Sequence, residues 1–148
     1  MGSIESVILG NVVIGGEAEG MVLITNVPLS IWGGLDSLTG EIIDRRHPLS
    51  GQTVSGRVLA LPHGRGSCSA SGVLLEAIKN GTAPVAILTS RIDPVLSLGA
   101  ILAQELYGLT MPLLQVDPPL FKELPTDRSL SIDLQGAIRW NPRYAGGD

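Results

Sequence analysis

Short apolar runs predict β-strands in the first part of the chain. Residues 6–14 and 20–27 are rich in valine and isoleucine, which fit the crowded surface of a pleated sheet. A third apolar run covers residues 54–62. Paired glycines and a Thr-Gly step mark residues 30–40 as a loop. We therefore expect three strands, with this loop between the second and the third.

The middle of the chain alternates between helical and strand patterns. Apolar positions recur at helical spacing over residues 73–79, and a second helical pattern ends at Gly108. One face of the first helix carries Leu74, Ala77 and Ile78. The apolar residues at helical spacing in the second are Leu98, Ile101, Leu102 and Leu106. Unbroken apolar runs at residues 85–88 and 112–116 are typical of strands buried on both faces of a parallel sheet.

These patterns predict an α/β fold. Together with the strand at 54–62, the middle has the order βαβαβ, which gives parallel strands with right-handed crossovers. Alternating apolar and polar residues at 130–134 predict a half-exposed strand near the end. Strands at both ends and βα units between them suit a three-layer β/β/α domain with one parallel and one antiparallel sheet. We expect one domain over residues 1–148, with a flexible tail from about 141 to 148.

Composition and charge narrow the classes of function. The formal net charge is −4 without a basic cluster, which argues against a nucleic-acid partner. We expect no membrane partner and a cytoplasmic location, because no apolar stretch approaches a membrane span and the start lacks a signal-peptide pattern. One cysteine, Cys68, and two histidines cannot by themselves complete a zinc or iron–sulfur site. Any metal chemistry is therefore expected to use ligands from another chain.

The segment of residues 63–72, His-Gly-Arg-Gly-Ser-Cys-Ser-Ala-Ser-Gly, joins a predicted strand to a predicted helix. Glycines allow a tight turn and close approach to a ligand, and the N-terminus of a helix attracts anions. Arg65 adds a planar, permanently charged donor group suited to carboxylate or phosphate. The spacing matches neither a P-loop nor a dinucleotide-binding fingerprint. An anion site and an ordinary turn capped by serines both remain open.

Four motifs in register resemble the small, swivelling subunit of the aconitase X family. The glycine-rich segment Gly64-Arg65-Gly66-Ser67-Cys68-Ser69 resembles its Gly-Arg-Gly-Ser-Ser/Cys-Ser signature. The other three lie at residues 32–40 (Trp-Gly-Gly-Leu-Asp-Ser-Leu-Thr-Gly), 47–51 (His-Pro-Leu-Ser-Gly) and 80–87 (Asn-Gly-Thr-Ala-Pro-Val-Ala-Ile). Order and spacing agree from about Gly15 to about Val116, so the resemblance covers most of the chain. It implies the aconitase-type swivelling fold.

The resemblance implies a hydro-lyase in which Ser67 abstracts a proton. It places substrate binding at the turn and at the loop before it, on Gly64, Arg65, Gly66, Cys68, Ser69, Gly33, Gly34 and Asp36. Alternatives stay open for several of these residues. Cys68 and Ser69 contact substrate or only pack and cap the helix, and Arg65 contacts substrate or only braces the loop. Asp36 orients the loop or Arg65, or serves only as a turn residue.

The resemblance also implies a partner. An aconitase X large subunit is expected to carry an iron–sulfur cluster or a divalent metal, while this chain alone binds no cofactor. The chain is then inactive by itself and active as half of a heteromer, or as a domain of a fused enzyme.

Two substrates fit the resemblance, and both are small hydroxy acids. The sequence is more similar to the branch that dehydrates cis-3-hydroxy-L-proline to Δ1-pyrroline-2-carboxylate than to the branch that acts on mevalonate 5-phosphate. Two other classes of function stay open. One is a phosphohistidine-type carrier using His63, and the other is a non-catalytic module that binds small carboxylates. Ser67 distinguishes the carrier from the dehydratase, because a carrier tolerates its loss and a dehydratase does not.

Overall fold

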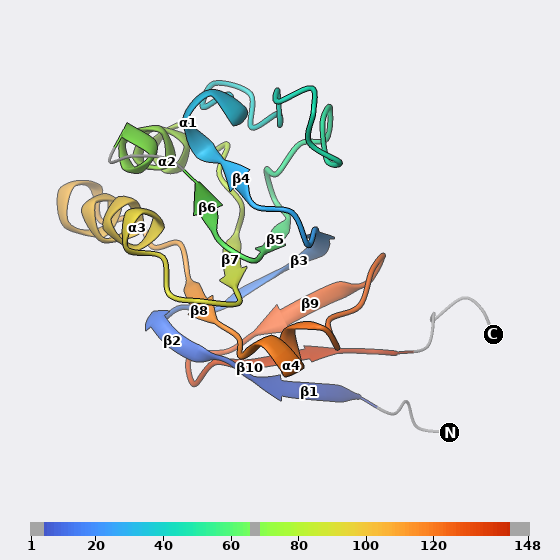
Figure 1. Ribbon diagram of the computed structural model, residues 1–148. Helices are drawn as coiled ribbons and strands as arrows, with labels where there is room; N and C mark the ends of the chain where they lie inside the picture. The colour runs from blue at the N-terminus through green and yellow to red at the C-terminus, as the bar shows by residue number, and fades with distance from the viewer. Residues whose placement is uncertain (1–4, 66–68, 143–148) are drawn as a thin grey trace.

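The computed structural model describes residues 5–65 and 69–142 (Figure 1). The strands are β1 (Ser6–Leu9), β2 (Asn11–Ile14), β3 (Ala18–Ile24), β4 (Leu29–Ser30), β5 (Val58–Leu61), β6 (Gly64–Arg65), β7 (Ala86–Thr89), β8 (Leu113–Gln115), β9 (Ser129–Ile132) and β10 (Ala137–Trp140). The helices are α1 (Ile31–Gly34), α2 (Ser69–Asn80), α3 (Pro94–Tyr107) and α4 (Pro118–Phe121). Across these ranges, no helix combines the length and the hydrophobicity that crossing a bilayer requires.

The strands form a parallel half and an antiparallel half that share β3. The hydrogen-bonded order is β1-β10-β9-β3-β5-β7-β8-β2. Strands β3, β5, β7 and β8 are parallel, and β2 runs antiparallel to β8. In the order β1, β10, β9 and β3, each strand is antiparallel to the next. Helices α2 and α3 lie on one side of the parallel strands, and β9, β10 and β1 lie on the other (Figure 1). The predicted β/β/α fold is confirmed.

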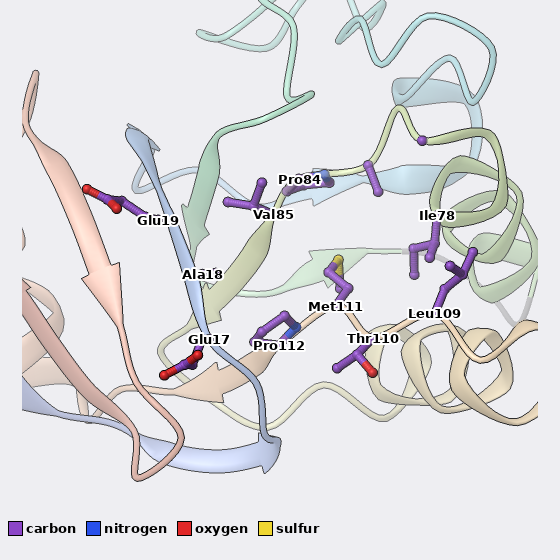
Figure 2. A pocket seen from close by; sticks show the side chains of 12 residues that line it. Glu17, Ala18, Glu19, Ile78, Pro84, Val85, Leu109, Thr110, Met111 and Pro112 are labelled. Carbon is purple, nitrogen blue, oxygen red and sulfur yellow. The ribbon is translucent and has the colours of Figure 1, made fainter.

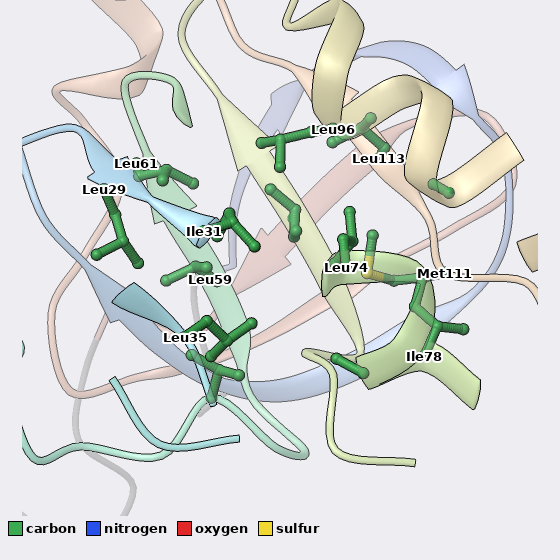
Figure 3. Packing of buried hydrophobic residues seen from close by; sticks show 14 of the residues in the cluster. Leu29, Ile31, Leu35, Leu59, Leu61, Leu74, Ile78, Leu96, Met111 and Leu113 are labelled. Carbon is green, nitrogen blue, oxygen red and sulfur yellow. The ribbon is translucent and has the colours of Figure 1, made fainter. Parts of the chain in front are cut away.

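Apolar side chains of the parallel strands alternate between two cores. In β5, Leu59 and Leu61 belong to the core beneath the helices, which Figure 3 shows, whereas Val58 and Ala60 belong to the core against the antiparallel strands. Strands β7 and β8 divide their residues in the same way. Both faces of these strands are therefore buried, as the unbroken apolar runs predict.

The first apolar run forms two strands, whereas the sequence pattern predicts one. β1 and β2 follow each other in the chain but lie at opposite ends of the strand order. The break falls at Gly10, whose N–H donates to the Gly136 carbonyl at 2.8 Å. A Cβ at Gly10 would lie 2.9 Å from Leu114 Cδ2, so the chain turns from one layer to the other at a position with no room for a side chain.

The last predicted strand ends earlier than the alternation of residues 130–134 indicates. β9 stops at Ile132, and Leu134 lies exposed in the turn to β10. The Asp133 carboxylate holds this turn, because it accepts from the Gln135 and Ala137 N–H groups and from the Arg139 guanidinium at 2.7 Å. The Arg139 hydrogen bond, followed by those backbone donors, lowers the pKa of Asp133. The predicted flexible tail lies mostly outside the described residues.

Helix α3 turns its small residues toward the protein and its large ones outward. Its buried face consists of Leu96, Gly99, Ala100 and Ala103, while Leu98, Ile101 and Leu106 are exposed. The reason is the close approach of α2, because a Cβ at Gly99 would lie 2.9 Å from the Ser71 carbonyl oxygen. The helical spacing of large apolar residues thus identifies the helix but not the face that it buries.

Two glycines in these helices make a matched test of the packing. Gly72→Ala in α2 places its Cβ in open space among the described residues, so it should stabilise the protein by about 1 kcal/mol through helix propensity. Gly99→Ala gains the same propensity but pushes against the α2 backbone, and overpacking typically costs about 1–3 kcal/mol. We expect thermal denaturation to show a raised Tm for Gly72→Ala and a lowered Tm for Gly99→Ala. An equal rise in both would contradict the close contact.

Candidate functional site

The Gly-Arg turn lies at the carboxyl end of β5 and is paired with a distant loop. After β5 the chain enters β6, which runs parallel to β4, with Gly64 opposite Leu29 and Arg65 opposite Ser30. This pairing places the glycine-containing loop that follows β4 beside Arg65, although about 30 residues separate them in the sequence (Figure 1). Two predicted parts of the site are thus neighbours.

Three predicted site residues, Gly66, Ser67 and Cys68, lie outside the described residues. The structure positions the two segments that flank them, β6 on one side and α2 on the other. Ser69 is the first residue of α2 and is exposed. Ser71, which the sequence makes a candidate cap, is buried, and its hydroxyl donates to the Val95 carbonyl of α3 at 2.7 Å.

Arg65 projects from an exposed position. Among the described residues, no hydrogen bond or ion pair engages its guanidinium group, and no ion pair joins it to Asp36. The Asp36 carboxylate accepts from the Leu38 N–H at 2.9 Å, and its carbonyl accepts from the Gly40 N–H at 2.7 Å. These are the hydrogen bonds of a turn residue. Arg65 is thus open to an anion.

The loop after β4 exposes one glycine and buries the other. Gly33 has φ 80° and lies exposed, next to a Trp32 side chain that is 62% exposed. A side chain would strain the backbone at this φ, so glycine is required at position 33. Gly34 is buried, and a Cβ there would lie 3.2 Å from Leu29 Cδ1. The loop therefore presents bare backbone and one indole ring beside β6.

Asp93, which the sequence patterns do not identify as part of the site, contacts the turn directly. One carboxylate oxygen of Asp93 accepts from the Gly64 N–H at 2.7 Å. The other accepts from the N–H groups of Val95 and Leu96, which caps the start of α3. An aspartate followed by proline is a signature of a helix start, so the cap was predictable. The bond to Gly64 was not, because it spans 29 residues.

A small hollow lies where these elements meet. It is lined by Ile31, Gly64, Arg65, Ala70, Asp93 and Leu96. A larger hollow of about 370 Å³ lies at the other end of the parallel strands (Figure 2). That hollow is lined mainly by aliphatic side chains, with Glu17 and Glu19 at one side, and it contains none of the predicted site residues. The chemistry-bearing residues therefore point to the Gly-Arg turn as the site.

The two histidines take structural positions. His47 is buried, with Nε2–H donating to the Val27 carbonyl and Nδ1 accepting from the Leu49 N–H. His63 is half-buried, and its Nδ1 lies 2.6 Å from the Gly64 carbonyl, a geometry that places the proton on Nδ1. Within the described ranges, no three His, Cys, Asp or Glu side chains gather to hold a metal ion. With one cysteine, the chain cannot ligate an iron–sulfur cluster by itself.

Comparisons with known proteins identify relatives along nearly the whole chain. The family model described as the aconitase X swivel domain matches residues 7–140. A cis-3-hydroxy-L-proline dehydratase of Pseudomonas aeruginosa is 50% identical over 106 residues, which are 72% of this chain and 18% of that protein. A phosphomevalonate dehydratase small subunit of Methanothermobacter thermautotrophicus is 44% identical over 88 residues, which are 60% of this chain and 67% of that subunit.

A solved structure agrees with these sequence matches. The holo form of Thermococcus kodakaraensis aconitase X superposes with a TM-score of 0.81 and 29% identity, covering 91% of this chain and 98% of that one. The chain spans about a fifth of the length of the cis-3-hydroxy-L-proline dehydratases that it matches. The resemblance predicted from the four motifs is thus confirmed, and the chain belongs to the aconitase X swivel-domain family.

Proposed function

We propose that this chain is the swivelling part of a hydro-lyase that converts cis-3-hydroxy-L-proline to Δ1-pyrroline-2-carboxylate, together with a large part of the enzyme. The observation that carries the proposal is the Gly64–Arg65 strand, held beside the Gly33 loop at the approach to α2. The hydroxyproline substrate is supported by 50% identity to a dehydratase of that specificity over 106 residues, against 44% over 88 residues for a phosphomevalonate dehydratase small subunit.

Dehydration of a 3-hydroxy amino acid needs a base at the α-carbon and an exit for the hydroxyl group. We assign the base to Ser67, whose deprotonated oxygen takes the α-proton. The C–H electron pair forms the new double bond, the C3–O bond breaks, and the hydroxyl leaves with a proton as water. The enamine product then tautomerises to Δ1-pyrroline-2-carboxylate. A metal or iron–sulfur centre on the large part supplies the Lewis acidity that favours departure of the hydroxyl.

The described residues can stabilise the negative charges that occur in this reaction. A guanidinium group binds a carboxylate through two parallel hydrogen bonds, so Arg65 can hold the substrate carboxylate. The positive charge also stabilises the enediolate-like charge that develops when the α-proton leaves. The N-terminus of α2, on the other side of residues 66–68, adds the positive end of the helix dipole. Both sources of positive potential would also stabilise the Ser67 alkoxide that the proposed base requires.

The surface around the turn supports a partner that covers it. Trp32 is 62% exposed in the loop beside β6, and Ile92 is 64% exposed next to Asp93. Arg65 is exposed as well, pairs with Ser30 and lines the same hollow as Asp93. Large apolar side chains around a polar site are typical of the centre of a protein interface. We assign this face to the large part, which would exclude water from the turn.

The second candidate is the small subunit of a mevalonate 5-phosphate dehydratase. It is favoured by the match to a relative that is itself a separate small subunit, of which the match covers 67%. Arg65 and the α2 N-terminus would then bind phosphate or carboxylate equally well. Assaying the assembled enzyme on both substrates separates the two candidates.

Replacing Ser67 tests the assigned base. Ser67→Ala should lower kcat of the assembled enzyme by about 10²–10⁴-fold, the usual contribution of general-base catalysis. His63→Gln should cost less than tenfold, because His63 only donates to a neighbouring carbonyl. Steady-state kinetics of both variants after co-purification with the large part give the answer. If Ser67→Ala is as active as wild type while His63→Gln is inactive, the carrier alternative is preferred.

Replacing Trp32 tests the docking face. Trp32→Ala should weaken association with the large part by about tenfold or more, as loss of a buried aromatic anchor does. Leu134→Ala is the control, because Leu134 is 59% exposed but lies in the β9–β10 turn, at the opposite end of β3 from the site. Isothermal titration calorimetry measures both dissociation constants. A loss of affinity in Leu134→Ala alone would place the interface elsewhere.

A further inference from the structure

The buried carboxylate of Asp93 links the start of α3 to the Gly-Arg turn. Asp93 is 9% exposed, and each of its two oxygens is used. Oδ2 accepts from the Gly64 N–H at 2.7 Å, and Oδ1 accepts from the N–H groups of Val95 and Leu96 at 3.0 and 3.1 Å. A carboxylate is planar and rigid, and its hydrogen bonds to N–H groups are short and strong. One side chain thus sets the distance between the two backbone segments.

The glycine at position 64 fits this contact. A Cβ at Gly64 would lie 3.2 Å from Asp93 Oδ2, which is closer than most side chains approach. The hydrogen bond to Asp93 also satisfies the Gly64 N–H group. This N–H is directed to the start of α3, although β6 pairs with β4. Arg65 is the next residue, so its direction depends on how Gly64 is held.

The segment on the other side of the turn is attached to the same place. The Ser71 hydroxyl of α2 donates to the Val95 carbonyl in the first turn of α3 at 2.7 Å. Both flanks of residues 66–68 are therefore bonded to the first turn of α3, one through Gly64 and the other through Ser71. Asp93 provides the first of these bonds and also orders the turn that provides the second.

We propose that Asp93 is a positioning residue for the dehydration, holding β6 and the first turn of α3 together so that Arg65 meets the substrate correctly. This inference rests on the proposed function. Asp93 touches neither the substrate nor the reacting atoms and acts through the Gly64 backbone. Positioning of this kind has large effects, because a misplacement of about 1 Å can cost about 10²-fold in rate.

Three variants separate positioning from mere stability. Asp93→Ser keeps a good N-cap for α3, but its shorter side chain does not reach Gly64. Asp93→Asn leaves a single accepting oxygen. The side chain can then accept from the N–H groups at the start of α3 or from the Gly64 N–H, but not from both. Ala103→Gly weakens the same helix through its propensity, more than two turns away, and leaves both bonds of Asp93 intact.

The test compares kcat, KM and Tm of the enzyme assembled with its large part. Asp93→Ser should lower kcat by about 10²-fold. Asp93→Asn should recover part of the loss, and Ala103→Gly should stay within threefold of wild type despite a similar or larger fall in Tm. If Asp93→Ser keeps kcat within threefold of wild type, or if Ala103→Gly loses as much activity, the proposal is overturned.

A second measurement does not depend on activity. Amide hydrogen exchange of the isotopically labelled full chain, followed by NMR, should show faster exchange at Gly64 in Asp93→Ser than in wild type or Ala103→Gly. Unchanged exchange at Gly64 overturns the proposal whatever the kinetics give. An assembled wild-type enzyme that is inactive on both substrates refutes the proposed function instead, and Gly64 exchange still decides whether Asp93 holds the turn.

Discussion

The burial of both faces of the parallel strands is the constraint on which this structure depends. All four residues of β5 and all four of β7 are buried, and only Thr89 among them is polar. Their apolar side chains point alternately toward the helices and toward the antiparallel strands. Burying one leucine stabilises a fold by about 1.5–3 kcal/mol, so neither covering layer is dispensable. Because the interior is aliphatic, polar groups that perform chemistry are confined to the ends of the strands.

The carboxyl end of β5 is the candidate site because several elements converge there. The two-residue strands β4 and β6 bring the Gly33 loop to the Gly-Arg turn, and small residues in α3 allow α2 to approach closely. The arrangement leaves Arg65 and Trp32 exposed. This face therefore presents one guanidinium group, bare backbone and an exposed indole.

Local patterns predicted the layers, both long helices and the parallel strands, because the period of the apolar residues differs between helices and strands. They failed where the conformation depends on contacts between residues that are distant in sequence. The run at residues 6–14 contains Gly10, which permits a break, but the change of layer there depends on the crowding by Leu114. The outward orientation of Leu98 and Ile101 in α3 follows from the approach of α2.

The candidate site shows the same division. Motifs along the chain located Arg65 and the Gly33 loop, since each motif is continuous in sequence. The β4–β6 pairing and the Asp93–Gly64 bond could not be predicted, because two-residue strands and a single hydrogen bond leave no periodic pattern. The cap that Asp93 forms on α3 was detectable from the aspartate before Pro94.

The most direct test of the account is turnover of cis-3-hydroxy-L-proline by this chain, by a large-subunit partner from the same source, and by the two combined. We predict product only from the combination, and faster turnover of hydroxyproline than of mevalonate 5-phosphate. Turnover by this chain alone would contradict the account, as would a stable complex that dehydrates neither substrate.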